Sequence, residues 1–282
     1  MGHKRVVLIT GANSGFGLLS SLSLAKRGCQ VIAAVRDVKK SNELLDRAKR
    51  EGTSHLIDVI QLDVTREDHI KEAFLYVESQ YGQLNVLVNN AGYSAGGMIE
   101  KLEIEEWRKQ LDTNLFGVIT MTKTFLPLLK NGKGAKIINL GSISGRVGFP
   151  GLAPYVTSKF AIGGFSESLR LELLPQNIYV CLIEAGSFQT NIWNKGLESV
   201  RSKKNGMNDP FFDSIYQQAK QTAAGAQDPA EVIQLIVKIS EAKKPKFRYH
   251  AGKGVRLLVL FKSILPWSLV EWLINKRLIK KK

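Results

Sequence analysis

Cysteine is scarce in this 282-residue sequence, which contains only Cys29 and Cys181. The two lie far apart, the first beside the apolar run CQVIAAV and the second within VCLI. So small a number argues against a disulfide-rich secreted scaffold and against a cysteine-based metal site. We therefore expect two buried thiols, no bound metal and a reducing, cytoplasmic compartment.

The sequence also lacks a long uninterrupted apolar run, and we expect no leader segment. A strand-like run, RVVLIT, begins at Arg5 and leaves no room for a signal or transit peptide, and MGHKRV has no serine or threonine of a myristoylation signal. Towards the C-terminus, Lys262, Pro266 and Glu271 interrupt the ~20 apolar residues that a membrane-spanning helix needs. We therefore expect the chain not to span a bilayer.

Acidic residues are too few to balance the basic ones: 40 Lys and Arg face 25 Asp and Glu, a net charge of +15. From Glu241 onward, twelve Lys or Arg face two acids, which places +10 of that charge in the last 42 residues. A tail that is both basic and apolar indicates peripheral contact with a membrane surface, or with an anionic partner, before it indicates nucleic acid. Its apolar side could instead cover a substrate pocket or pack against another subunit.

Short β-branched runs alternate with longer helix-compatible stretches over the first 185 residues. Nearly continuous apolar strands separated by helices indicate a parallel sheet covered on both faces. We predict an α/β fold with a single doubly wound (Rossmann) domain over 1–254, about seven strands, a substrate loop or lid over 187–228 and a basic apolar extension over 255–282. The predicted strands are 5–10, 29–35, 55–62, 83–90, 135–142, 178–184 and 245–252, and the predicted helices are 16–28, 38–51, 66–81, 103–129, 154–175 and 229–240.

A glycine-rich turn, TGANSGFG, follows the first predicted strand and opens the first helix. Its glycines, Gly11, Gly15 and Gly17, form the pattern G-x-x-x-G-x-G. Glycines permit a tight turn and a close approach of backbone N–H groups to a pyrophosphate at a helix N-terminus. The turn therefore predicts a dinucleotide site, although such turns also serve merely to join a strand to a helix.

The second strand ends in VRD, with Arg36 and Asp37 at its tip. An acid at this place would bind a ribose 2′-hydroxyl, whereas an arginine accommodates a 2′-phosphate. Arg36, with Ser14 in the glycine turn, favours NADP(H), and NAD(H) is the alternative cofactor. Arg36 and Asp37 could instead simply pair in a solvated loop.

Tyr155 and Lys159, in YVTSK, are spaced to share one face of a helix that begins near Pro154. A free tyrosine titrates near pH ~10, and a neighbouring cation favours the phenolate, which lowers the pKa towards the range useful for proton transfer. A catalytic pair is one interpretation of this spacing. A chance pair on a solvated helix face is the other.

Together, TGANSGFG, NNAG at 89–92, Asn114, Ser142 and YVTSK closely resemble the classical short-chain dehydrogenase/reductase family. The resemblance covers about residues 4–190 in the expected order, with Ser142 thirteen positions before Tyr155. Retinol-dehydrogenase-like and hydroxysteroid-dehydrogenase-like enzymes share the overall pattern. The ordered set is far more specific than any one of its elements.

The resemblance implies four catalytic roles. Tyr155 would be the acid in carbonyl reduction and the base in alcohol oxidation, and Lys159 would lower its pKa and bind the nicotinamide ribose. Ser142 would donate to the substrate oxygen, and Asn114 would help hold a water that links Lys159 to solvent. Asn114 could instead bridge helices, and Ser142 could end a strand.

The resemblance also implies a cofactor site, in which Asp63 would contact the adenine unless it merely caps the following turn. Ala185 stands where the family commonly has proline, which puts the loop around the nicotinamide in doubt. The implied cofactor residues are Gly11, Asn13, Ser14, Gly15, Phe16, Gly17, Arg36, Asp63, Asn90, Ala91, Gly92, Tyr155, Lys159, Gly186 and Thr190.

The expected function is NADP(H)-dependent interconversion of an alcohol and a carbonyl on a small apolar, lipid-like substrate. Phe188 and Trp193 in 187–228 would contact the substrate together with Ser142 and Tyr155, unless these rings only anchor the segment. The alternatives are a regulatory protein that senses NADP(H) without turnover and an adaptor at a membrane surface. Family members are often homodimers or homotetramers, and the adjacent Gly163 and Gly164 would permit close packing.

Overall fold

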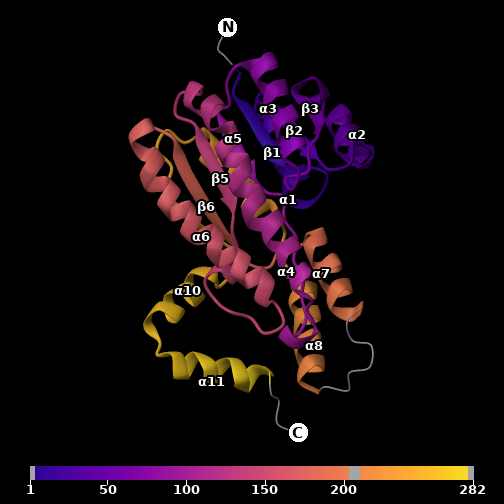
Figure 1. Cartoon of the computed structure of the whole chain (residues 1–282), viewed down its shortest axis with the longest axis vertical. Coiled ribbons are helices and arrows are strands. Elements are labelled where there is room, and N and C mark those ends of the chain that lie inside the picture. The colour runs from indigo at the N-terminus through magenta and orange to yellow at the C-terminus, as the bar shows by residue number, and fades with distance from the viewer. Residues whose placement is uncertain (1–3, 203–209, 279–282) are drawn as a thin grey trace.

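A seven-stranded parallel sheet forms the centre of the computed structural model, which describes residues 4–202 and 210–278 (Figure 1). The strand order is β3-β2-β1-β4-β5-β6-β7, so the chain reverses its direction of winding between β1 and β4. The predicted doubly wound sheet is confirmed. The strands are β1 Val6–Thr10, β2 Gln30–Val35, β3 Ile57–Gln61, β4 Val86–Asn89, β5 Lys136–Leu140, β6 Tyr179–Ala185 and β7 Arg248–Ala251.

Helices cover both faces of the sheet, and the strand side chains alternate between two cores. Val7 and Ile9 of β1 pack with helices α1, α2 and α9, whereas Val6 and Leu8 pack with α3 and α5. Because helices shield both faces from water, the strands are apolar at almost every position. The helices are α1 Gly15–Lys26, α2 Asn42–Arg50, α3 Glu67–Tyr81, α4 Ile104–Leu111, α5 Gly117–Asn131, α6 Ala153–Leu173, α7 Asn191–Ser202, α8 Pro210–Ala224, α9 Ala230–Glu241, α10 Val255–Ile264 and α11 Trp267–Leu278.

Two segments differ from their predicted form. The stretch 103–129 is not one continuous helix, because a π-helical turn at Asp112–Phe116 separates α4 from α5. The predicted loop 187–228 is largely helical and contains α7 and α8. Its aromatic side chains had suggested a lid, but they also give α8 an apolar side, and Phe212 is buried there.

The extension folds as α10 and α11, which lie near the end of the sheet where α7 and α8 gather (Figure 1). Its first residue, Val255, is buried beside Gly186, where an added Cβ would lie 2.8 Å from Val255 Cγ2. Within the described parts of the chain, no helix combines the length and apolarity needed to cross a bilayer.

Candidate active site

The carboxyl ends of β1, β4 and β5 bring the glycine turn, NNAG and Ser142 to one edge of the sheet. This edge includes the point between β1 and β4 where the winding reverses, which is where doubly wound folds bind ligands. Helix α6 adds Tyr155 and Lys159 beside Ser142. Residues far apart in the sequence thus meet because parallel strands end together.

The glycine turn is packed too closely against the β4 loop to accept side chains. Gly11 has φ +67°, and a Cβ on it would lie 3.0 Å from Ala91 Cα. A Cβ on Gly17 would lie 2.6 Å from Asn90 Nδ2 and closer still to Gly11 O. Glycine is therefore required for packing at Gly17 and for backbone conformation at Gly11.

Asn90 supports the glycine turn from the side of β4. Its Nδ2 donates to Thr10 O at 2.8 Å and to Gly11 O at 3.1 Å. Thr10 Oγ1 in turn accepts from Asn90 N at 3.1 Å and from Ala91 N at 3.0 Å. Sequence reasoning missed Thr10, whose only signal was a hydroxyl at the end of an otherwise apolar strand.

Asn114 lies in the π-helical turn and is 1% exposed. Its Oδ1 accepts from Tyr93 N at 3.1 Å, and its Nδ2 donates to Tyr93 O at 2.9 Å and to Ser158 Oγ at 3.2 Å. Ser158 Oγ donates to Tyr155 O at 2.7 Å. Asn114 thus bridges the β4 loop and α6, and the π turn is the feature that places it there, as such turns often do at functional sites.

Lys159 contacts the backbone of β5 as well as the Tyr155 ring. Its Nζ donates to Leu140 O at 2.8 Å and lies 5.6 Å from the centroid of the Tyr155 ring. An added Cβ on Gly145 would lie 2.6 Å from Lys159 O, so the loop after Ser142 packs directly on this turn of α6. The predicted shared face of Tyr155 and Lys159 is confirmed.

We expected Lys159 to lower the pKa of Tyr155. In the protein without bound cofactor, the pKa of Tyr155 is instead raised. Burial raises the pKa of the Tyr155 phenol, and a hydrogen bond with Ser142 opposes that rise. Burial also lowers the pKa of Lys159 to about 8. A buried site disfavours phenolate and ammonium alike, and burial is the largest cause of both shifts.

At two strand tips, the acidic side chains make local contacts. Asp37 Oδ1 accepts from Lys39 N at 3.0 Å and Oδ2 lies 3.9 Å from Lys40 Nζ, so Asp37 caps the next turn while Arg36 stays exposed. Asp63 Oδ1 accepts from Thr65 N at 3.0 Å. Asp63 therefore does cap its turn, whatever else it contacts.

Beyond β6, the chain folds back over the glycine turn. Thr190 Cβ lies 3.4 Å from the position of a Cβ on Gly15, and the Phe188 ring meets that of Phe16 edge to face at 5.8 Å. Phe188 is 2% exposed, so it anchors this segment, whereas Trp193 at the start of α7 is half-buried. Ala185 continues β6 in register with Ala251, a strand position where proline could not donate a hydrogen bond.

Several buried polar residues near the site were missed by sequence reasoning. Asn89 Nδ2 donates to Asn139 Oδ1 at 2.9 Å, and Asn139 Nδ2 donates to Ser166 Oγ at 2.9 Å. Glu184 is 2% exposed inside β6. The signal for all three was a polar residue within an apolar strand, which has to find a partner when buried.

The arrangement can bind a dinucleotide and move a proton. The glycine turn opens α1, whose N-terminal N–H groups suit a pyrophosphate, and Gly92 lies against Asn114 beside the turn. Tyr155 and Ser142 place two hydroxyls at the same strand edge. Within residues 4–202 and 210–278, His, Cys, Asp and Glu side chains form no group of three or more that could hold a metal.

Comparison with known proteins agrees with this geometry. Residues 5–200 match the family model described as short chain dehydrogenase. The chain is 44% identical to the uncharacterized oxidoreductase YusZ of Bacillus subtilis, over 98% of this chain and 99% of that one. It is 34% identical to 3-ketodihydrosphingosine reductase of Bacteroides thetaiotaomicron, over 96% of each chain, and 34% identical to human retinol dehydrogenase 8, over 92% of this chain and 85% of the other.

A match over more than half of the chain, together with these identities, establishes the family that the ordered motifs had indicated. The fold places the glycine turn at the winding reversal and brings Ser142, Tyr155 and Lys159 together. The chain therefore belongs to the short-chain dehydrogenase/reductase family and is an oxidoreductase that acts on CH–OH groups with NAD(P).

Proposed function

We propose that this protein interconverts an alcohol and a carbonyl on an apolar, lipid-like substrate, with NADP(H) as its preferred cofactor and Tyr155 as the acid and base. The observation that supports this most is that the fold brings Tyr155, Ser142 and Lys159 together at the strand edge, with Asn114 bonded to Ser158 in the same turn of α6. A protein that only sensed the cofactor would have no need of this set.

In carbonyl reduction, the bound nicotinamide supplies a hydride to the substrate carbon. Tyr155 gives its proton to the oxygen, and Ser142 donates a hydrogen bond to that oxygen as negative charge develops. Because burial raises the pKa of Tyr155, the phenol stays protonated and ready to act as the acid at neutral pH. Lys159, charged below about pH 8, would hold the nicotinamide ribose.

Arg36 is the residue proposed to select NADP(H). It is exposed at the tip of β2, and Asp37 beside it is engaged in capping the next turn, so the arginine can meet a 2′-phosphate. We expect Arg36→Ala to raise the KM for NADPH about 10-fold to 100-fold, the value of one or two hydrogen bonds to a charged group, while the KM for NADH stays within about twofold.

Lys40→Ala is the matched control for Arg36→Ala, because Lys40 is an exposed cation on the following turn that lies 3.9 Å from Asp37. Initial rates with both cofactors on the two variants and the parent measure the effect. Equal losses with NADPH and NADH in Arg36→Ala would contradict a role in choosing between them.

A lipid-like substrate is supported by the half-buried Trp193 near the site and by the names of the relatives, two of which act on a ketodihydrosphingosine and on retinol. The direct test is a panel of long-chain ketones, retinoids, steroids and short aldehydes. Oxidation of NADPH and NADH is followed in parallel. Turnover confined to short polar carbonyls, or binding of neither cofactor, would overturn the proposal.

We also propose that the extension contacts an anionic membrane surface. Nine large apolar residues of α10 and α11 are 39–68% exposed. Lys262 and Lys276 lie 4.5 Å and 4.7 Å from the Trp267 and Trp272 rings, so cations and exposed indoles share this surface. Tryptophan and lysine side by side suit the interface of a bilayer that carries negative headgroups.

Replacing Trp267 and Trp272 by serine is expected to weaken binding to phosphatidylserine vesicles at least about tenfold, because each exposed indole buries large apolar area in the interface. The control is Leu75→Ser, which removes a 50% exposed apolar residue from α3 on another face. Vesicle sedimentation, with and without salt, measures the binding of the parent and of each variant. Light scattering measures self-association. Loss of a dimer instead of vesicle binding would assign the surface to a second copy.

A further inference from the structure

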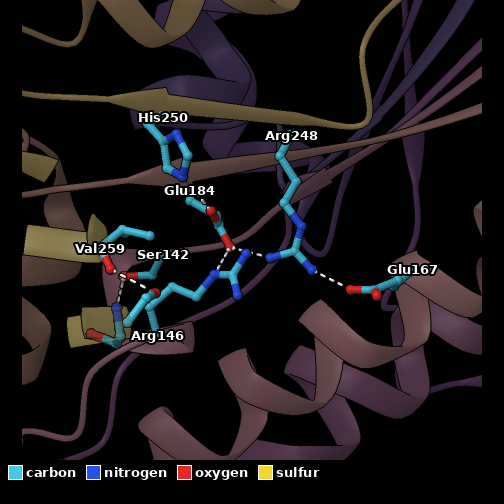
Figure 2. A network of polar contacts seen from close by, with 9 residues as sticks. Ser142, Arg146, Glu167, Glu184, Arg248, His250 and Val259 are labelled. Carbon is cyan, nitrogen blue, oxygen red and sulfur yellow. Dashed lines mark hydrogen bonds and ion pairs between the residues drawn. The ribbon is translucent and has the colours of Figure 1, made fainter. Parts of the chain in front are cut away.

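Glu184 is a charged residue within an otherwise apolar strand, and basic groups from two other parts of the chain converge on it (Figure 2). Its Oε1 accepts hydrogen bonds from Arg146 Nε at 2.7 Å and from Arg248 Nη1 at 3.1 Å. Arg248 also pairs with Glu167 of α6. Burying a carboxylate is unfavourable unless its charge is paired and its oxygens accept hydrogen bonds, and the two arginines provide both here.

The second oxygen of Glu184 meets a histidine of β7. The parallel register places Glu184 opposite His250, and His250 Nε2 lies 2.9 Å from Glu184 Oε2. Neither atom has a hydrogen-bond partner of good geometry among the described residues, so the two atoms are in close polar contact without an aligned hydrogen bond. The second oxygen of the carboxylate is thus enclosed by the β7 side of the cluster, while its first oxygen carries the hydrogen bonds from the two arginines.

Arg146 connects this carboxylate to the loop that presents Ser142. Ser142 begins a single 3₁₀ turn, Ile143–Gly145, and Arg146 follows that turn directly. The turn has little freedom at its base, because a Cβ on Gly141 would lie 3.1 Å from Ile183 O of β6. At its other end, Arg146 fixes the turn to β6 through the charge of Glu184.

The charges of this cluster also balance without any further group. Glu184 and Glu167 offset Arg146 and Arg248 when His250 is neutral. The Glu184 side chain is 3% exposed, whereas those of Arg248 and Arg146 are 20% and 33% exposed, so both arginines reach a buried carboxylate from partly exposed positions. Water has little access to Glu184, and the carboxylate therefore depends on the two arginines for its charge balance.

We propose that Glu184 is a positioning residue for the reaction: by clamping Arg146, it fixes the 3₁₀ turn so that the Ser142 hydroxyl faces Tyr155 and the reacting oxygen. The inference rests on the proposed function for the role of Ser142. Among the described residues, no hydrogen bond or ion pair joins Glu184 to Tyr155 or to the glycine turn, so Glu184 acts through the turn that it fixes.

A double-mutant cycle tests this dependence. Arg146→Ala releases the clamp, and kcat is expected to fall about 10-fold to 100-fold, because a small misplacement of a donor is costly in catalysis. Ser142→Ala is expected to lower kcat by about 10²–10³, as the loss of an oxyanion donor does. In the Ser142→Ala background, Arg146→Ala should then change kcat by less than about twofold, since the group it positions is gone.

The pH dependence of alcohol oxidation is a second test, because a general loss of stability would not shift the pKa that it measures. The Ser142 hydrogen bond lowers the pKa of Tyr155, so losing it raises that pKa. Alcohol oxidation needs the phenolate, and its rising limb should therefore move to higher pH in Arg146→Ala, in Glu184→Gln and in Ser142→Ala. The dissociation constant for NADPH, measured by fluorescence, should stay within about twofold of the parent.

Glu167→Gln is the matched control, because it removes the exposed acid at the other side of Arg248 and leaves the contact between Arg146 and Glu184 intact. Its kcat and pH profile should match those of the parent. Arg146→Lys, which keeps the charge but not the Nε donor, serves if Arg146→Ala unfolds, and should show a smaller shift in the same direction.

The outcomes separate the two proposals. Equal turnover in the parent and Ser142→Ala would overturn the proposed function itself. Two other outcomes would overturn only the positioning role of Glu184. One is a lower kcat in Ser142→Ala with an unchanged kcat in Arg146→Ala, and the other is a double variant in which the two losses of kcat multiply.

Discussion

Replacing Tyr155 by phenylalanine is expected to lower turnover by about 10²–10⁴-fold, the contribution of a positioned general acid or base. The change removes one oxygen from α6 and leaves the ring. The ring contact with Lys159, 5.6 Å from Nζ to centroid, and the hydrogen bond from Lys159 to Leu140 O remain available. NADPH should therefore still bind, with a dissociation constant within about threefold of the parent.

Single-turnover measurements on an accepted substrate, paired with fluorescence titration of NADPH, separate loss of chemistry from loss of binding. Tyr76→Phe is the control: its hydroxyl also has a partner, Asp58 Oδ2 at 3.1 Å, but it lies on α3 and Asp58 lies near the amino end of β3, whereas the site is at the carboxyl ends of the strands. The control should keep its turnover. A Tyr155→Phe enzyme with more than about a tenth of the parent rate would show that another group moves the proton.

Gly17→Ala is expected to abolish measurable NADPH binding and to destabilise the fold by about 3 kcal/mol or more, the upper range for overpacking. The added Cβ would lie 2.6 Å from Asn90 Nδ2, inside contact distance of Gly11 O and 3.0 Å from Ala12 Cα. Two of these neighbours are backbone atoms, which cannot rotate away. Relief therefore requires the glycine turn to move from α1.

Gly225→Ala is the matched control, because Gly225 is exposed after α8 and a Cβ there would meet its nearest atom, Gln221 O, at an ordinary 3.5 Å. Thermal unfolding with and without NADPH measures both effects. The control should unfold within about 0.5 kcal/mol of the parent and keep its shift on adding NADPH, as surface substitutions do. A Gly17→Ala protein that still gained stability from NADPH would show that the turn accommodates a side chain.

The amino-acid sequence by itself determined the order of the strands and of most helices, and it indicated the residues that are proposed to react. Runs such as VVLIT are apolar at every position because their strands are covered on both faces, and that pattern is local. The i,i+4 spacing of Tyr155 and Lys159 needs only a helix to bring them together. The glycine turn likewise follows from three residues within one short segment.

Only the tertiary structure decided how these residues are held and how they titrate. The π turn at Asn114 depends on contacts with Tyr93 and Ser158, which are 21 and 44 positions away in the sequence. The raised pKa of Tyr155 comes from burial, which periodicity does not predict. The partners of Glu184 come from a loop and from β7, so its role depends on long-range packing rather than on any local pattern.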